Sequence, residues 1–194
     1  MEIVFASHNK HKLLEVSKML PNNVFLVNLE DINCISEIPE TSDTITGNAL
    51  QKANYVKVNY GRDCFADDTG LEIDALNGVP GVYSARWAGE NCSYQDNIDK
   101  ALFEMKGIKN RNARFKTVIA LILKNETHLF EGIIEGEITK YPIGKSGFGY
   151  DPVFKPKGYS QTFAEMSDDL KNKISHRGIA VNKLVEFLRT LKIK

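Results

Sequence analysis

The stretch that most constrains this chain runs from Cys64 to Asp74, where two adjacent acids, a threonine and a glycine follow a short apolar run. The apolar residues can be buried in a sheet, Thr69-Gly70 has turn chemistry, and residues 71–74 alternate as a half-exposed strand would. Because successive side chains of a strand point to opposite faces, we expect one of Asp67 and Asp68 to face a site and the other to support it. Two acids at a strand end suggest a Mg²⁺ site, although an ordinary polar turn has the same composition.

The overall composition bounds the class of protein. The chain has 194 residues, 42% of them hydrophobic and 26% charged, so we expect residues 1–194 to form one globular domain with two lobes. Its 25 basic and 25 acidic residues balance, so no global field favours a nucleic acid or a membrane as partner, and any basic site must be local. The apolar run 118–123 is too short to span a bilayer and residues 1–7 do not resemble a signal peptide, so we expect a cytoplasmic protein. The three cysteines are widely spaced and predict buried thiols.

The N-terminal segment predicts a strand, a polar loop and a helix. Ile3–Ala6 is the strand, Ser7–Lys12 is the loop, and apolar residues recur at helical spacing from Leu13 to Leu20. A phosphate at this junction would meet free N–H groups, the positive end of the helix dipole and a lysine charge. In the alternative interpretation, Ser7 or Asn9 only caps the helix and the lysines are solvated.

A second acid precedes the next helix. Val24–Leu29 predicts a strand, and Thr44 is a plausible N-cap for the next helix. The apolar face of that helix consists of Ile45, Ala49, Leu50, Ala53 and Val56. Glu40 stands in the loop before this helix, where its carboxylate could reach a metal held by Asp68. A solvated acid that favours the helix N-terminus is the simpler explanation.

The middle of the chain predicts a hairpin and a long loop. Phe115–Leu123 and Leu129–Ile138 are β-rich and are separated by Lys124–Thr127, which indicates an antiparallel hairpin in a sheet whose earlier strands are parallel. We expect this hairpin to form the second lobe of a mixed sheet. The Gly- and Pro-rich segment 76–89 is predicted to be an ordered loop over the site or at a subunit contact, although packing alone would explain its aromatic residues.

Two stretches of the C-terminal half carry further candidate residues. Gly147 and Gly149 bracket Phe148, whose ring is a natural platform for a planar base, with Asp151 as an acceptor; a packed corner is the alternative. Near the start of the last helix stand three cationic residues, Lys171, His176 and Arg177. Cations are unfavourable at a helix N-terminus unless an anion or acceptor lies between them, so their position implies a ligand.

Five motifs together resemble the inosine triphosphate pyrophosphatase family, nearly end to end: Ser7–Lys12, Ala66–Leu71, Gly78–Arg86, Gly147–Pro152 and Ile174–Arg177. The resemblance implies hydrolysis of noncanonical purine nucleoside triphosphates such as ITP, dITP and XTP to the monophosphate and pyrophosphate. It implies Mg²⁺ as cofactor and a homodimer. It also implies an α/β fold of two lobes, with a central elongated mixed sheet flanked by helices and an active-site cleft between the lobes.

The resemblance also assigns roles to single residues. It implies that the triphosphate is bound by the loop residues Ser7, His8, Asn9, Lys10, His11 and Lys12. Asp68 corresponds to the proton acceptor and metal ligand, and Glu40 to the second metal carboxylate. Thr69 stands where the motif more often has serine, so we expect substrate contact to persist. Base recognition is implied for Phe148, Gly149, Tyr150, Asp151, Lys171, His176 and Arg177. Where many relatives carry Glu-Asn-Ala, this chain has Gly47-Asn48-Ala49 and no carboxylate.

Two other functions fit the same motifs. One is a related pyrophosphatase that acts on pyrimidine or methylated nucleotides, as in the septum-formation inhibitor family. The other is a nucleotide-binding sensor without turnover. Inosine and xanthine carry a 6-oxo acceptor where adenine carries an amino donor. Cationic donors at that edge therefore favour a noncanonical purine nucleotide as the substrate.

Overall fold

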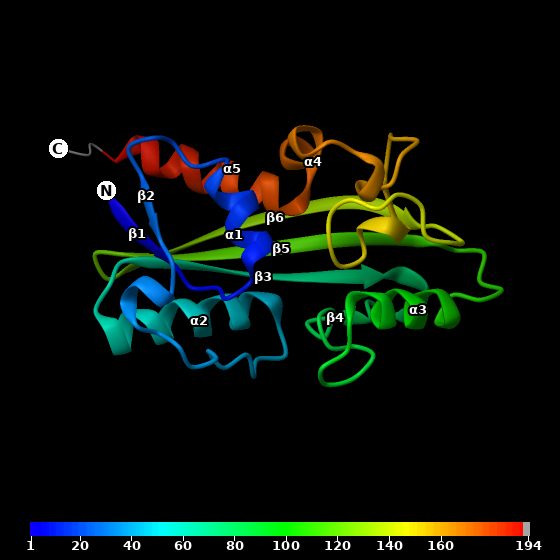
Figure 1. The fold of residues 1–194 in the computed structure, drawn as a ribbon, viewed down its shortest axis with the longest axis horizontal. Helices are drawn as coiled ribbons and strands as arrows, with labels where there is room; N and C mark the ends of the chain where they lie inside the picture. Colours follow the sequence, from blue (N-terminus) through cyan, green and yellow to red (C-terminus); the bar gives the residue numbers. More distant parts are fainter. Residues whose placement is uncertain (192–194) are drawn as a thin grey trace. The chain divides into compact units, whose positions relative to one another are not determined.

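The computed structural model describes residues 1–191, in which the strands of one mixed sheet follow the order β2-β1-β3-β5-β6-β7, with β4 paired to β3 (Figure 1). The strands are β1 (Glu2–Phe5), β2 (Phe25–Val27), β3 (Cys64–Ile73), β4 (Pro80–Gly81), β5 (Asn112–Leu123), β6 (Glu126–Ile138) and β7 (Phe154–Pro156). The α-helices are α1 (Lys10–Ser17), α2 (Ile45–Tyr60), α3 (Tyr94–Glu104), α4 (Asp168–Ile174) and α5 (His176–Thr190). Strand β1 pairs parallel with β2 and β3, whereas β7 pairs antiparallel with β6, so the predicted α/β class with a mixed sheet is confirmed.

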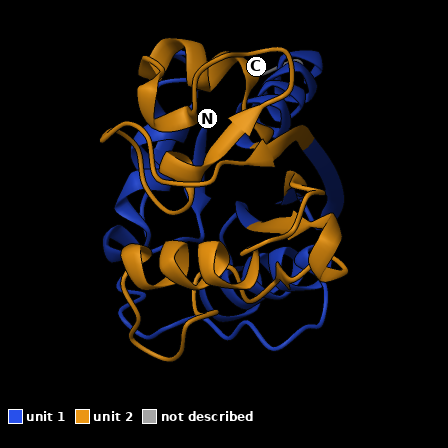
Figure 2. Cartoon of the chain, turned by 90° about the vertical axis from the view of Figure 1, so that its right-hand side faces the viewer, with its two compact units in different colours: residues 1–68, 117–132, 177–194 blue, residues 69–116, 133–176 orange. Residues whose placement is uncertain are grey.

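The chain divides into two compact units. Unit 1 comprises residues 1–68, 117–132 and 177–194, and unit 2 comprises residues 69–116 and 133–176 (Figure 2). The tip of the β5–β6 hairpin therefore belongs to unit 1, so the prediction that the hairpin forms the second lobe is wrong. The reason is packing, because Ile119, Leu121 and Leu123 of the hairpin join the core of unit 1.

The core of unit 1 is formed by apolar side chains of the strands and by the apolar stripe of helix α5. Ile3 and Phe5 of β1 point to the same face, and Phe5 stacks on Phe65 of β3 with ring centroids 4.8 Å apart. Helix α5 adds the apolar stripe Ala180, Val181, Leu184, Val185 and Leu188. Helix α2 lies on the opposite side of β3 from α5, so the strands of this unit are covered on both faces (Figure 1). This arrangement brings side chains of three helices to one strand, β3.

The core of unit 2 is largely aromatic. Phe115 of β5 packs edge-on against Phe154 of β7, with ring centroids 4.7 Å apart, and Phe163 lies 5.3 Å from Phe154. Helix α3 starts at a capping box in which Ser93 and Asp96 satisfy each other's backbone N–H groups, and it adds Ile98 and other residues to this core. The aromatic core holds the loop and short helix that carry the predicted base-recognition residues.

Strand β3 does not turn at Thr69-Gly70. It continues from Cys64 to Ile73, and its far end pairs with β4, where Leu71 is opposite Gly81. Tertiary pairing therefore overrides the local turn propensity. The hairpin turn is also shorter than predicted, because β6 already begins at Glu126. The two residues of the turn, Lys124 and Asn125, have left-handed backbones with φ of 49° and 68°.

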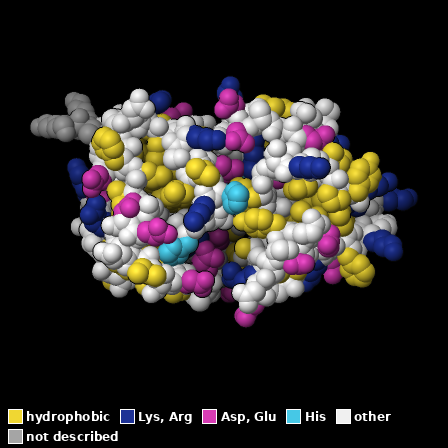
Figure 3. Space-filling model, viewed as in Figure 1, with side chains coloured by type: hydrophobic (Ala, Val, Ile, Leu, Met, Phe, Trp, Pro, Cys, Tyr) yellow, Lys and Arg dark blue, Asp and Glu magenta, His cyan; other side chains and the backbone are white. Residues whose placement is uncertain are grey.

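The surface and the cysteines agree with most of the compositional predictions. On the face drawn in Figure 3, acidic and basic side chains of the described residues are interspersed rather than gathered into one basic area. Among residues 1–191, no helix combines the length and the apolarity needed to cross a membrane. Cys34 and Cys64 are buried as predicted, whereas Cys92 is half-buried.

Candidate functional site

The two acids of β3 contact different helices of unit 1. The Asp67 carboxylate accepts hydrogen bonds from Lys12 Nζ of α1 at 3.0 Å and from Arg177 Nε of α5 at 3.2 Å. Asp68 instead faces α2, where Asn48 Nδ2 donates to it at 3.2 Å and Lys52 Nζ lies 3.8 Å away. The alternation of a strand thus gives the two neighbouring carboxylates separate partners, as expected.

Asp67 is the buried centre of an ionic network. Burial alone would raise the pKa of its carboxyl, but the charges of Lys12 and Arg177 outweigh it and hold that pKa well below the usual range. Arg177 Nη1 also donates to Glu15 Oε2 of α1 at 2.6 Å. Burial lowers the pKa of the Lys12 ammonium, against the opposing effect of Asp67. Asp67 therefore stays ionised and fixes Lys12, a role of support rather than proton transfer.

Asp68 has the opposite electrostatic character. Burial raises the pKa of its carboxyl above the ordinary value, although Lys52 and Lys12 pull in the other direction. Lys52 also donates to Glu40, so a single buried ammonium lies beside both carboxylates that were predicted to hold a metal. Burial lowers the pKa of Lys52, but Asp68 and Glu40 raise it by more, which keeps the ammonium charged.

The Ser7–Lys12 loop is built as a helix start. Asn9 Oδ1 accepts from the backbone N–H groups of His11 at 3.0 Å and Lys12 at 3.2 Å, and Ser7 Oγ accepts from the N–H of Asn9 at 3.3 Å. Asn9 is therefore the N-cap of α1, as the alternative interpretation held. The same interpretation is wrong for Lys12, whose side chain is bound to Asp67 instead of being solvated. His8, Lys10 and His11 are exposed, and His8 Nε2 lies 3.2 Å from the Ser36 carbonyl oxygen.

The predicted base-recognition loop forms an aromatic cluster in unit 2, made of Phe148, Asp151 and Lys171. Asp151 Oδ2 accepts from the N–H of Phe148 at 2.8 Å and from Lys171 Nζ at 2.7 Å, and the Lys171 ammonium lies 4.8 Å from the centre of the Phe148 ring. Gly147 has a φ of 78°, and a Cβ at this position would overlap the Asp151 carboxylate. The glycine is thus required both for backbone conformation and for space.

The remaining predicted residues of unit 2 have other partners. The His176 ring is buried and stacks on Phe115, with centroids 4.5 Å apart and an interplanar angle of 16°. The Tyr150 hydroxyl donates to the Ser84 carbonyl at 2.9 Å. Gly149 has a φ of 60°, and Thr69 is half-buried in β3.

Arg177 has different partners from the other predicted base-recognition residues. It belongs to unit 1 and is paired with Glu15 and Asp67, whereas Lys171 and His176 belong to unit 2. The carboxylates explain why a cation is tolerated at the start of α5. Its role toward a base remains a prediction.

Several side chains of these clusters were not identified from the sequence. Asn48 and Lys52 lie within the buried stripe of α2, where a charged residue among apolar ones was a usable signal. Glu15 gave no signal, because its partner Arg177 is 162 residues away. Tyr94 of α3 lies 6.0 Å from the Phe148 ring, measured between centroids.

The donor set of unit 1 suits a hard cation. Within residues 1–191, no three His, Cys, Asp or Glu side chains are grouped so that they could hold a metal ion. Asp68 and Glu40 nevertheless offer carboxylate oxygens to one point charge, that of Lys52, and such oxygens are the ligands that Mg²⁺ prefers. The residues present therefore fit a divalent cation held by two carboxylates.

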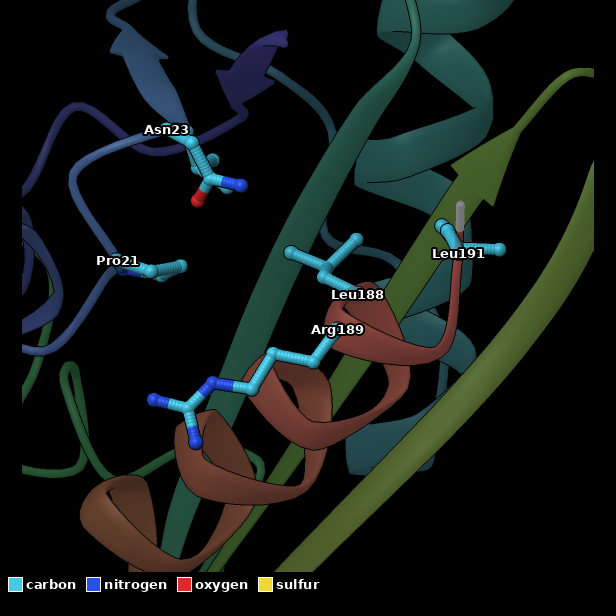
Figure 4. Close-up of a pocket in the computed structure, with 6 residues that line it drawn as sticks. Pro21, Asn23, Leu188, Arg189 and Leu191 are labelled. Carbon is cyan, nitrogen blue, oxygen red and sulfur yellow. The ribbon is translucent and has the colours of Figure 1, made fainter. Parts of the chain in front are cut away.

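A cavity in unit 1 lies away from these residues. It has a volume of about 260 Å³ and is lined by Pro21, Asn23, Val24, Leu188, Arg189 and Leu191 (Figure 4). These residues include the last turn of α5, whereas Arg177 is at its start, roughly 20 Å along the helix axis. This cavity is therefore not part of the ionic network around Asp67.

Comparisons with known proteins identify the family of the chain. A sequence model of the Ham1 family matches residues 3–187. A dITP/XTP pyrophosphatase of Flavobacterium johnsoniae is 55% identical over 192 residues, covering 99% of this chain and all of the relative, and one of Bacillus subtilis is 44% identical over 191 residues, covering 96% of each. The structure of the Staphylococcus aureus Ham1 protein superimposes with a TM-score of 0.91 at 38% identity, covering 99% of this chain and all of that one. On this evidence, the chain belongs to the Ham1 family.

Proposed function

We propose that this chain hydrolyses noncanonical purine nucleoside triphosphates, namely dITP, XTP and ITP, to the nucleoside monophosphate and pyrophosphate. Relatives of the same length and up to 56% identity are named dITP/XTP pyrophosphatases, which supports this substrate class. The structural observation that carries the proposal is the buried acid pair of β3 with a lysine beside each carboxylate. Nothing in the comparisons favours a pyrimidine substrate.

The triphosphate is assigned to unit 1. The N–H groups at the start of α1 and the Lys12 ammonium would neutralise phosphate charge, and Asp67 holds that ammonium in place. Asp68 would orient a water molecule and accept its proton. The water oxygen would bond to the α-phosphorus while the bond from this phosphorus to the bridging oxygen breaks, and pyrophosphate would leave. A Mg²⁺ ion held by Asp68 and Glu40 would supply further charge neutralisation.

The purine base is assigned to unit 2. Phe148 would stack against the ring, and Lys171 would donate to the 6-oxo group of hypoxanthine or xanthine. Lys171 is buried beside the Phe148 ring and is held there by Asp151. Adenine presents an amino donor at the same edge, so a site of this kind can reject it by about 10⁴-fold or more.

A substrate panel tests the proposal. The protein is incubated with Mg²⁺ and dITP, dATP, dGTP, dUTP or a methylated dTTP, and pyrophosphate is measured. Pyrophosphate from dITP supports the proposal, preferential cleavage of a pyrimidine contradicts it, and binding without product identifies a sensor. Orthophosphate release would instead indicate a phosphatase.

The Asp68→Asn variant tests the assigned base. It should abolish turnover and leave the far-UV circular dichroism spectrum unchanged, because it removes a charge but little volume. Appreciable residual activity would remove Asp68 from the catalytic role. We further propose a cytoplasmic homodimer, and sedimentation velocity measures the assembly directly.

A further inference from the structure

The Lys52 ammonium lies beside two carboxylates, those of Glu40 and Asp68. Its side chain is only 7% exposed, and its ammonium contacts Glu40 and lies 3.8 Å from Asp68 Oδ1. A buried ammonium costs several kcal/mol to desolvate unless carboxylates surround it. The carboxylates of Glu40 and Asp68 therefore stabilise the charge of the buried Lys52 ammonium.

The fold builds this arrangement from one helix and one loop. Asn48 and Lys52 are four residues apart on α2, so both side chains lie on the face toward Asp68. The loop that carries Glu40 is tied to the same helix, because Asn48 Oδ1 accepts from the N–H of Ser42 at 2.9 Å.

A second tie fixes the loop next to Glu40 itself. Gln51 accepts from the N–H of Thr41 at 2.9 Å and donates to its hydroxyl at 3.0 Å. Gly47 lets the loop approach the helix, since a Cβ there would overlap Ser42. The contact of Glu40 with Lys52 is thus built into the local structure and is not a chance meeting of surface side chains.

We propose that Lys52 is the internal counter-ion of Asp68 and Glu40 in the metal-free protein, and that it competes with the divalent cation for these two carboxylates. This inference rests on the proposed function, which assigns both acids to the metal. Two cations repel strongly in a poorly hydrated site, so the ammonium must withdraw when the metal binds. The protein without nucleotide should therefore bind Mg²⁺ weakly, and the metal should arrive together with the nucleotide, whose phosphates add the negative charge that retains both cations.

The test is titration of the nucleotide-free protein with Mg²⁺ by isothermal calorimetry. Lys52→Met removes the ammonium and keeps most of the length of the side chain. Lys57→Met is the matched control, because Lys57 is on the same helix but pairs with Asp63 at 2.9 Å. Lys52→Met should bind Mg²⁺ about tenfold or more tighter than the wild type, whereas Lys57→Met should equal the wild type.

Thermal unfolding gives a second readout. Without metal, Lys52→Met removes the ammonium beside Asp68 and Glu40, so its Tm should fall, and Mg²⁺ should raise that Tm by more than it raises the Tm of the wild type. If the Met variant does not fold, Lys52→Gln takes its place in both measurements.

Two results would overturn the inference. One is Mg²⁺ binding by Lys52→Met that is unchanged or weaker, and the other is an equal gain in the Lys57→Met control. Failure of the proposed function gives a different pattern, because the wild type would then release no pyrophosphate from dITP. Adding Asp68→Asn to Lys52→Met should abolish the tight binding, and retained binding would show that Asp68 is not a ligand.

Discussion

The substitution Asp67→Asn tests the ionic network that holds Lys12. The Asp67 side chain is 1% exposed, and those of its partners Lys12 and Arg177 are 13% and 3% exposed. Removing the charge leaves two buried cations, and breaking a buried pair in this way costs about 3–5 kcal/mol. Arg177 keeps Glu15 as a second partner, so we expect the lower end of that range, about 3 kcal/mol.

Guanidinium unfolding followed by circular dichroism measures this loss. For a chain of this size, about 3 kcal/mol corresponds to a Tm lower by about 6–12 °C. The matched control is Glu2→Gln, which breaks an exposed pair with Arg62 and should cost less than about 1 kcal/mol. A loss of less than about 1 kcal/mol in Asp67→Asn at pH 7 would refute the reasoning.

The change of this stability difference with pH gives a further test of the Asp67 network. Because the folded pKa of Asp67 lies below its unfolded value of about 3.9, the stabilisation is fully present above that unfolded value and is lost as the pH falls toward the folded pKa. The difference between wild type and Asp67→Asn should therefore be largest near neutral pH and shrink below about pH 4. A difference that grows in acid would contradict the assignment.

Three further predictions follow from the geometry of unit 2 and from the thiols. Gly147→Ala should raise the KM for dITP at least several-fold, because its φ is 78° and its Cβ would displace Asp151; an unchanged KM in steady-state kinetics would contradict this. Lys171→Met should reduce the ratio of kcat/KM for dITP to that for dATP by tenfold or more, roughly the worth of one buried hydrogen bond, and an unchanged ratio would exclude the 6-oxo contact. In the folded protein at pH 8, a thiol reagent should modify the half-buried Cys92 and spare Cys64, whose pKa burial raises to about 12; peptide mapping identifies the modified residue.

Local signals in the sequence were enough to locate the starts of two helices. Thr44 was expected to cap one helix and Asn9 was one of two candidate caps for another, and each caps its helix through its side-chain oxygen. Capping depends on residues within one turn, so a single sequence contains the necessary information. The same holds for the alternation that sends Asp67 and Asp68 to different partners.

Long-range packing decided the points that the sequence left open. Arg177 lies 110 residues from Asp67, so no local pattern could reveal that the acid explains the cation at the start of α5. The uninterrupted β3 depends on pairing with β4, and the division of the β5–β6 hairpin depends on which core its apolar side chains enter. The sequence motifs singled out the candidate residues of the site, whereas neighbours such as Lys52 became visible only through their contacts.

The most direct measurement is pyrophosphate release from dITP and from dATP by the wild-type protein with Mg²⁺ under identical conditions. We predict rapid release from dITP and a kcat/KM for dATP lower by about 10⁴-fold, because the donors of the base site match a 6-oxo group and clash with a 6-amino group. Equal turnover of the two nucleotides, or no pyrophosphate from dITP, would contradict the central claim.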